Sequence, residues 1–271
     1  MINHRAFNIL GNIAIVNFSD KTKSSDKKKF AKEILKKNLT IKTILEKSGK
    51  FSGRLRKMKT KHLAGEKNKE VLYKENNCVF RFNIDTSYFS PRLSNERKEI
   101  ASKIKKNDKV LVMFAGVAPF SIVIAKNSKA KVYSNEINQE ANKYAKMNIE
   151  LNKLKDKIEL VPGDIKRLVK QGKLHRSVSP KLRNAGRKFD VIVMPRPKLK
   201  NSFLEQAFKL SKKGTRIYYY DFCKVGEEKK IVEKVKSEAK KFKKKIKILK
   251  VKHAGDIAPY KIRLRVDFRI I

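Results

Sequence analysis

The region from residue 109 to the C-terminus alternates short apolar segments with segments of helical periodicity. Such alternation predicts an α/β fold, with an open, mostly parallel sheet and helices packed on both of its faces. The segment 189–194 is almost wholly apolar, which is typical of a central parallel strand covered on both sides. The expected strands are 109–114, 130–134, 158–161, 189–194, 215–222, 246–252 and 262–270, the last two as an antiparallel edge. The expected helices are 119–126, 138–151, 203–210 and 227–244.

The first 85 residues lack this alternation and predict a small, separate α+β domain. Its expected elements are two strands within 6–18, a helix within 30–45, a basic loop over 50–61, and strands at 70–74 and 78–84. We therefore expect a small domain over residues 1–85 and a Rossmann-like domain over residues 86–271. The basic stretch 166–188 interrupts the second domain, either as an RNA-facing loop or as a tolerated surface insertion.

The charge of the chain indicates a polyanionic partner. Lys and Arg total 69 against 26 Asp and Glu, a formal net charge of +43. Nucleic acid is the leading candidate, since cations that contact phosphates release condensed counterions, and an anionic membrane surface is a weaker one. No apolar run approaches the roughly 20 residues of a membrane span, and two distant Cys with four His predict no metal site. We expect a cytoplasmic monomer with two reduced thiols.

Three features fall where the first three expected strands of the sheet end. Gly116 follows the first strand, Glu136 the second and Asp164 the third. Ligands of open α/β sheets bind at these carboxyl ends. A glycine lets the backbone approach a ligand closely, and a carboxylate there accepts the hydrogens of ribose hydroxyls. The set predicts a site for S-adenosylmethionine, whereas the lack of a full G-x-G-x-x-G argues against NAD or FAD.

Two longer motifs resemble a known family. They are Tyr88-Phe89-Ser90-Pro91-Arg92-Leu93-Ser94-Asn95-Glu96-Arg97 and Met113-Phe114-Ala115-Gly116-Val117-Ala118-Pro119-Phe120. With the shorter stretches 11–16, 62–66, 75–78, 136–138 and 258–260, they resemble the archaeal and eukaryotic tRNA (guanine-37-N1)-methyltransferases. The resemblance covers nearly the whole chain and implies a class I methyltransferase that moves a methyl group from S-adenosylmethionine to N1 of guanosine 37, beside the anticodon.

The resemblance also implies roles for individual residues. Glu96 would be the general base that removes the N1 proton, and Arg56 would hold the guanine O6, with Arg54 as a rival. The residues expected to bind the cofactor are Arg97, Phe114, Gly116, Glu136, Ile137, Asp164 and Ile165. Those expected to contact RNA are Arg54, Lys57 and Arg92. Tyr88 and Phe89 would pack in the core rather than stack on a base.

One departure from the family pattern concerns the turn after the fourth strand. Members usually carry an Asn there that helps to position the base, and this chain has Pro195, which has neither a side-chain amide nor an N–H donor. Ala118, a milder change, replaces a usual Gly. Three alternatives to a simple guanine methyltransferase stay open. They are additional C7 methylation of the wyosine precursor 4-demethylwyosine, transfer of the 3-amino-3-carboxypropyl group in wyosine biosynthesis, and a non-catalytic basic RNA-binding protein.

Overall fold

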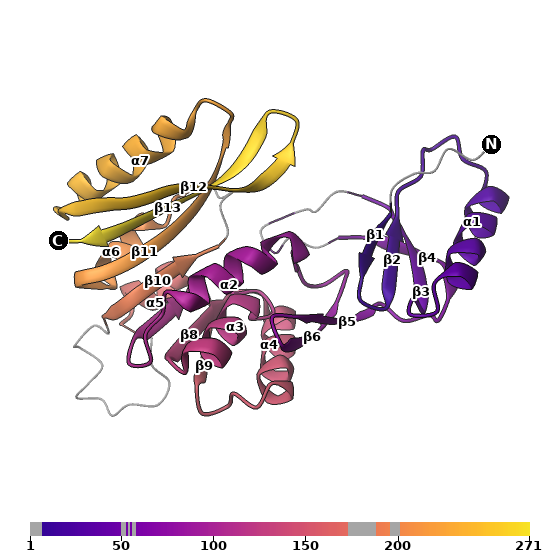
Figure 1. The fold of residues 1–271 in the computed structure, drawn as a ribbon, viewed down its shortest axis with the longest axis horizontal. Helices are drawn as coiled ribbons and strands as arrows, with labels where there is room; N and C mark the ends of the chain where they lie inside the picture. Colours follow the sequence, from indigo (N-terminus) through magenta and orange to yellow (C-terminus); the bar gives the residue numbers. More distant parts are fainter. Residues whose placement is uncertain (1–6, 50–52, 54, 56–57, 173–187, 196–200) are drawn as a thin grey trace.

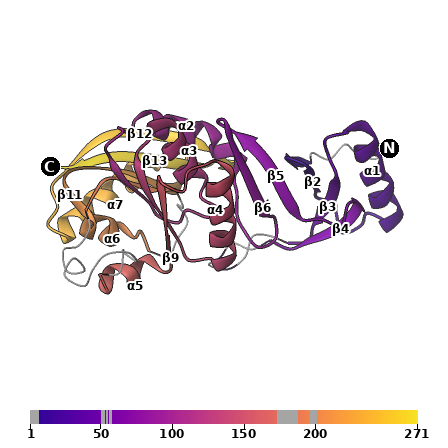
Figure 2. The same ribbon diagram turned by 90° about the horizontal axis from the view of Figure 1, so that it is seen from below.

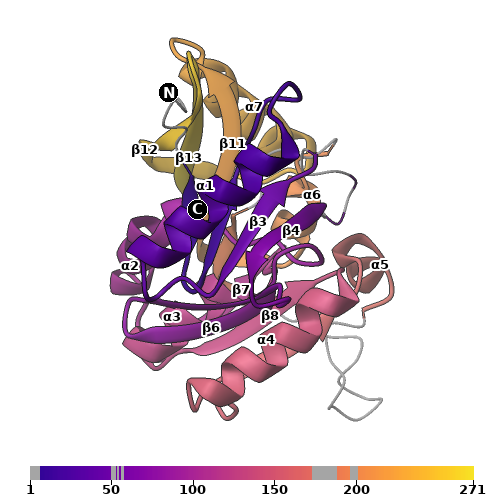
Figure 3. The same cartoon turned by 90° about the vertical axis from the view of Figure 1, so that its right-hand side faces the viewer.

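The computed structural model describes residues 7–49, 53, 55, 58–172, 188–195 and 201–271. Figure 1 shows a small N-terminal unit beside a larger one that is built around a long sheet. The small unit contains β1 (Asn8–Leu10), β2 (Ile13–Val16), α1 (Ser24–Lys37), β3 (Thr43–Lys47) and β4 (Thr60–Gly65). Its strands follow the order β1-β2-β3-β4, with β2 and β3 parallel. Helix α1 connects these two strands and covers one face of the sheet with Phe30 and Ile34 (Figure 3).

The helix expected within 30–45 was wrong at its C-terminal end. Helix α1 ends at Lys37, and Ile44 and Leu45 belong to strand β3. Both side chains are fully buried because β3 is covered on its two faces. The buried residues of this strand continue the apolar spacing of the helix before it, so the sequence pattern predicted one longer helix. Strand β4, which pairs antiparallel with β3, was missed altogether.

A two-stranded hairpin, β5 (Glu70–Glu75) and β6 (Cys78–Asn83), follows the small unit. Figure 2 shows it between the N-terminal sheet and helix α4 (Gln139–Leu151) of the larger unit. Two helical side chains replace the strand that β6 lacks on its outer edge. Asn148 bonds both the N–H and the C=O of Arg81, and Asn152 does the same for Val79.

The larger unit is a seven-stranded sheet in the order β12-β13-β11-β10-β7-β8-β9. Its strands are β7 (Lys109–Val112), β8 (Lys131–Glu136), β9 (Ile158–Pro162), β10 (Phe189–Met194), β11 (Ser211–Lys224), β12 (Ile246–Ala258) and β13 (Lys261–Ile270). The central position of β10, parallel to both β7 and β11, and the antiparallel edge formed by β12 and β13 are confirmed.

Alternate residues of the strands supply two separate cores. Val110 and Val112 face α2 (Ser94–Ser102), α3 (Pro119–Ser128) and α4, whereas Leu111 faces α5 (Ile165–Lys170), α6 (Leu204–Lys209) and α7 (Glu228–Lys241). A short 3₁₀ turn, η1 (Pro91–Leu93), precedes α2. The first residues of the stretch 166–188, which was expected to be a loop, belong to helix α5. Residues 173–187 of that stretch lie outside the described residues.

Candidate active site

A pocket opens at the carboxyl ends of β7, β8 and β10, where the strand order reverses. The chain leaves β7 for β8 on one side and returns through β10 on the other, which is the usual ligand position in such sheets. The space in and at the mouth of the pocket is about 640 Å³, which includes the part that is open to solvent. Its lining consists of Leu55, Tyr88, Phe89, Ser90, Leu93, Arg97, Phe114, Ala115, Gly116, Pro119, Phe120, Glu136, Asn138, Ala141 and Pro195.

The turn between β7 and α3 has an unusual backbone. Phe114, Gly116 and Ala118 have φ values of 58°, 59° and 68°, all in the left-handed region. Only glycine adopts this region freely, so Phe114 and Ala118 carry strain that the surrounding packing must hold. A Cβ at Gly116 would stand 3.3 Å from the carbonyl oxygen of Tyr88. The turn thus brings the backbone against the pocket wall, as a close-fitting ligand site requires.

Glu136 ties the ends of β7 and β8 together. Its Oε2 accepts a hydrogen bond of 2.8 Å from the N–H of Gly116, and its Oε1 accepts from the N–H groups of Ile137 and Asn138, also at 2.8 Å. A carboxylate offers about four acceptor positions, so capacity remains for a hydroxyl of a bound ligand. The residues present fit the ribose of an adenosyl group at this point.

Arg97 lines the pocket and is 1% exposed. Its guanidinium donates to Glu75 at the end of β5, with an Nη2–Oε2 distance of 2.6 Å, and to the carbonyl of Ser90 at 3.0 Å. It also lies over the rings of Phe89 and Phe120, at 5.0 Å and 5.7 Å from their centroids. The hairpin therefore neutralises the cation in the pocket wall. Arg97 reaches the pocket as a packed, paired side chain.

Three expected cofactor residues are near the pocket without lining it. Ile137 donates its N–H to Glu136. Asp164 caps α5 by accepting from the N–H of Lys166 at 2.9 Å, and Ile165 is buried in the core beneath. Asn135 connects this loop to β8, since its amide donates to the carbonyls of Val161 and Gly163. Of the expected set, the structure gathers Arg97, Phe114, Gly116 and Glu136 around one cavity.

Glu96 is not among the residues that line this pocket, and its carboxylate contacts side chains of β11, β12 and β13. It is 4% exposed, and three donors surround its carboxylate. Its Oε2 accepts from the hydroxyl of Tyr220 at 2.8 Å and from Arg265 at 2.5 Å, and its Oε1 accepts from Lys252 at 2.6 Å. Burial would raise the pKa of Glu96, but the hydrogen bond from Lys252 and the charge of Arg265 outweigh it and lower the pKa.

A larger groove, of about 1670 Å³, separates the N-terminal unit from the antiparallel edge of the sheet. Arg92, Phe222, Ile257 and Arg263 are among its lining residues, and Tyr88 borders both this groove and the smaller pocket. Arg92 is exposed, as an RNA contact requires. Arg54, Arg56 and Lys57 lie outside the described residues.

The core role expected for Phe89 is confirmed. It is 7% exposed, and its ring stacks on that of Phe82 with centroids 4.8 Å apart and contacts Tyr73 and Phe80. Tyr88 is half-buried and lies in the wall between the two cavities.

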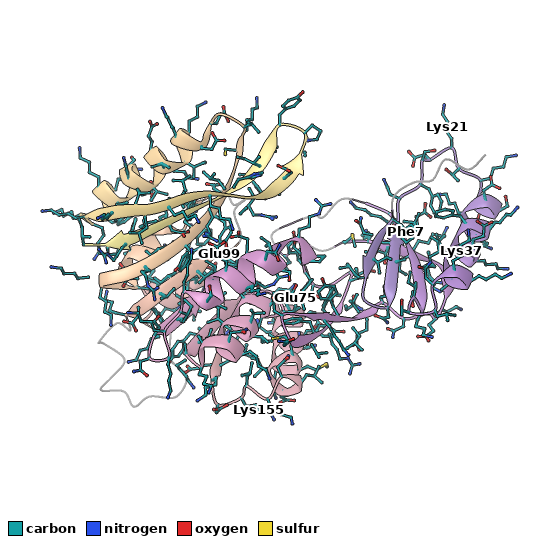
Figure 4. All side chains as sticks on the ribbon, in the orientation of Figure 1. Phe7, Lys21, Lys37, Glu75, Glu99 and Lys155 are labelled. Atoms are coloured by element: carbon teal, nitrogen blue, oxygen red, sulfur yellow. The ribbon has the colours of Figure 1, made fainter. Side chains whose placement is uncertain are left out.

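Sequence reasoning missed the partners of Glu96. Arg263, Arg265, Asp267 and Arg269 alternate with apolar residues along β13, a pattern that is normally half exposed to solvent. In the fold, helix α2 covers the middle of this polar face, where Arg265 is 0% exposed, whereas Arg269 stays exposed. Glu99 of α2, labelled in Figure 4, also accepts from Arg265 and is half-buried. The sequence signal that could have indicated this cluster was the pair Arg263 and Arg265 within an otherwise mostly apolar strand.

Neither a metal cluster nor a membrane helix is found in the described part of the chain. No group of three or more His, Cys, Asp or Glu there could hold an ion. Likewise, none of its helices is long and apolar enough to cross a bilayer. Cys78 and Cys223 are free and buried.

Two family models match the chain. The TRM5/TYW2 methyltransferase domain matches residues 71–249, and the TYW2 N-terminal domain matches residues 3–68. The tRNA (guanine(37)-N(1))/4-demethylwyosine(37)-methyltransferase of Nanoarchaeum equitans is 33% identical, over 98% of this chain and 100% of its own length.

Solved structures agree with these matches. The Trm5b structure from Pyrococcus abyssi has a TM-score of 0.81 at 31% identity, over 98% of this chain and 74% of that one. The Methanocaldococcus jannaschii Trm5 complex with adenosine has a TM-score of 0.75 at 29% identity, over 98% of this chain and 72% of that one.

Proposed function

The chain belongs to the TRM5/TYW2 methyltransferase family, and on that premise we propose that it methylates N1 of guanosine 37 in tRNA, with S-adenosylmethionine as the donor. The observation that carries the proposal is the pocket at the switch point of the sheet. There the Gly116 turn and the Glu136 carboxylate form a cradle that fits an adenosyl group. When bound, the cofactor supplies an electrophilic methyl group on a sulfonium.

The residues around the pocket have distinct proposed roles in holding the cofactor. Glu136 accepts the ribose hydroxyls, and Gly116 and Phe114 give the close backbone approach. Arg97, paired with Glu75, stiffens the wall rather than adding net charge. Ile137, Asp164 and Ile165 support the strand ends beside the adenine, and Asp164 does so as the cap of α5.

The chemistry needs a group that accepts the N1 proton. In the proposed step the carboxylate of Glu96 would take the N1 proton, which would leave the N1 electron pair free to bond the methyl group that the cofactor supplies. Glu96 is held deprotonated by its neighbours, which is the form that a base requires. Arg56 is the proposed partner of O6, where charge develops as N1 loses its proton.

The substrate would occupy the larger groove. Arg92 on its wall and Arg54 and Lys57 in the basic loop 50–61 would contact phosphates of the anticodon loop. Guanosine 37 must leave its stack to reach the pocket, which unpaired loop nucleotides do at modest cost. Tyr88, between groove and pocket, would border the path of the base.

C7 methylation of 4-demethylwyosine is a second candidate activity. The Nanoarchaeum equitans relative carries both activities in its name and matches along its whole length. Pro195 lines the pocket and offers no donor to the base, so the contacts that select plain guanine are reduced. We propose that the site accepts the larger tricyclic base as well as guanine.

The test is methylation of two tRNAs, one with unmodified G37 and one with 4-demethylwyosine at position 37, followed by nucleoside mass spectrometry. We expect 1-methylguanosine from the first and a methylated precursor from the second. A 3-amino-3-carboxypropyl adduct would assign the alternative transfer, and binding without product would assign the non-catalytic one. Glu96→Gln should lower the rate at least about 100-fold. The exposed Glu150→Gln on α4 is the matched control and should not change it.

We further propose that the protein is a cytoplasmic monomer with a domain boundary at residue 85. Residues 1–85 would position the RNA and residues 86–271 would carry out methyl transfer. The two buried free thiols suit a reducing compartment. Light scattering of the free enzyme tests the monomer. Limited proteolysis tests the boundary, and cleavage near residue 85 would support it. Cleavage before the hairpin β5–β6 would contradict it, because that hairpin is hydrogen-bonded to α4 of the second domain.

A further inference from the structure

Arg265 is the most deeply buried cation beside Glu96, and its role is not explained by the proposed function. It is 0% exposed and contacts three carboxylates. Its guanidinium donates to Glu96 Oε2 at 2.5 Å, to Glu99 Oε1 at 2.7 Å and to Asp267 Oδ1 at 2.7 Å. A buried cation with this many charged partners holds them in one geometry, because moving any of them would leave an uncompensated charge.

The groups that face Glu96 come from four elements. They are Glu99 on α2 and Lys103 directly after it, Tyr220 on β11, Lys252 on β12, and Arg265 and Asp267 on β13. The three cations and three carboxylates cancel in formal charge. The cluster is therefore neutral while Glu96 is deprotonated, which suits its burial.

The two oxygens of Glu96 have different surroundings. Oε2 is held by Tyr220 and Arg265, both 0% exposed. Oε1 is covered by Lys252, whose side chain is 30% exposed. Lys252 also contacts Glu99, so it keeps an ionic partner when it leaves Oε1. Of the groups that bond the carboxylate, Lys252 is thus the one within reach of solvent. The groove residues Phe222 and Arg263 form a cross-strand pair, two residues along the same strands from the pair Tyr220 and Arg265.

We propose that Arg265 is a positioning residue: together with Tyr220 it holds Oε2 of Glu96, so that Oε1 receives the proton from the substrate base after Lys252 shifts to Glu99. The inference deepens the proposed function and rests on Glu96 as the base. The proton that leaves N1 joins Oε1, and the bonds to Oε2 are kept throughout. Restoring the starting state requires only loss of that proton to solvent past Lys252.

The test compares Arg265→Met with Arg265→Lys in single-turnover methylation of saturating tRNA over pH 5 to 9. We expect the methionine variant to lose roughly 10- to 100-fold in rate, with the affinities for tRNA and S-adenosylhomocysteine unchanged. Its acidic limb should move to higher pH, because Glu96 loses a cation that lowers its pKa. The lysine variant should recover part of the rate. Lys212→Met, which removes the ion pair with Asp190 elsewhere in the same sheet, is the matched control.

A second variant guards against simple loss of folding. Tyr220→Phe removes one donor to Oε2 while keeping the ring in the core, and it should give a smaller rate loss with a pH shift of the same sign. If Arg265→Met and Tyr220→Phe both keep the wild-type rate and pH profile while Glu96→Gln is inactive, this inference is wrong but the assignment of Glu96 as the base stands. A fully active Glu96→Gln would instead overturn the base assignment on which it rests.

Discussion

Asn148 should contribute more to stability than any surface polar residue of α4, because it completes the edge of a strand. Its Oδ1 accepts from the N–H of Arg81 at 2.7 Å, and its Nδ2 donates to the carbonyls of Arg81 and Val117 at 3.0 Å and 3.1 Å. The side chain is fully buried. Asn148→Ala removes three hydrogen bonds and leaves three backbone groups without that partner.

The expected cost follows from these contacts. Each lost bond costs about 1 kcal/mol, and more where the remaining group cannot reach water, so the sum is about 2–5 kcal/mol. An unfolding entropy of roughly 2.1 cal/mol/K per residue, taken over 271 residues, converts this to a fall in Tm of about 4–9 °C. Hydrogen exchange should also accelerate across β6, because its outer edge loses a partner.

The assay is thermal unfolding followed by circular dichroism, with hydrogen exchange of residues 78–83 read by mass spectrometry. Asn95→Ala, the same substitution at an exposed position of α2, is the control and should change Tm by less than about 1 °C. An Asn148→Ala protein with unchanged Tm and unchanged exchange in β6 would refute the view that helical amides complete this hairpin.

Three further outcomes are expected. Glu136→Gln, which loses a carboxylate acceptor for backbone N–H groups, should weaken S-adenosylhomocysteine binding by calorimetry roughly 5- to 150-fold, and unchanged affinity would contradict the cradle. The bonds to Arg265 and the neighbouring lysines lower the pKa of Glu99. The stabilisation from these bonds is therefore present above about pH 4.3 and is lost on acidification. Between pH 5 and 3 the Tm should fall less steeply in Glu99→Gln than in wild type. Burial raises the pKa of the Cys78 thiol to about 11. In a Cys223→Ser background, a thiol reagent at pH 8 should therefore react on the order of 100-fold more slowly with native than with unfolded protein. Equal rates would show that Cys78 is accessible.

The central parallel sheet could be predicted because its signal is local. A strand buried on both faces must be almost wholly apolar, and Phe189–Met194 meets that condition at every residue but Asp190, without reference to the rest of the chain. The switch-point pocket followed from the same pattern, since Gly116 and Glu136 lie at the carboxyl ends of β7 and β8. The helix boundary at Lys37 was missed because a buried strand follows it closely and continues its apolar spacing.

By itself the sequence determined the family, the central parallel strand and the residues at the carboxyl ends of the strands, since all of these depend on short motifs and periodicity. Only the tertiary structure decided that the polar face of β13 is covered by α2 and that Arg265 meets Glu96 there, 169 positions away along the chain. It also decided that Arg97 is neutralised by Glu75. Alternation along a strand separates two faces but does not say what covers the polar one, and that depends on which helix the fold brings over it.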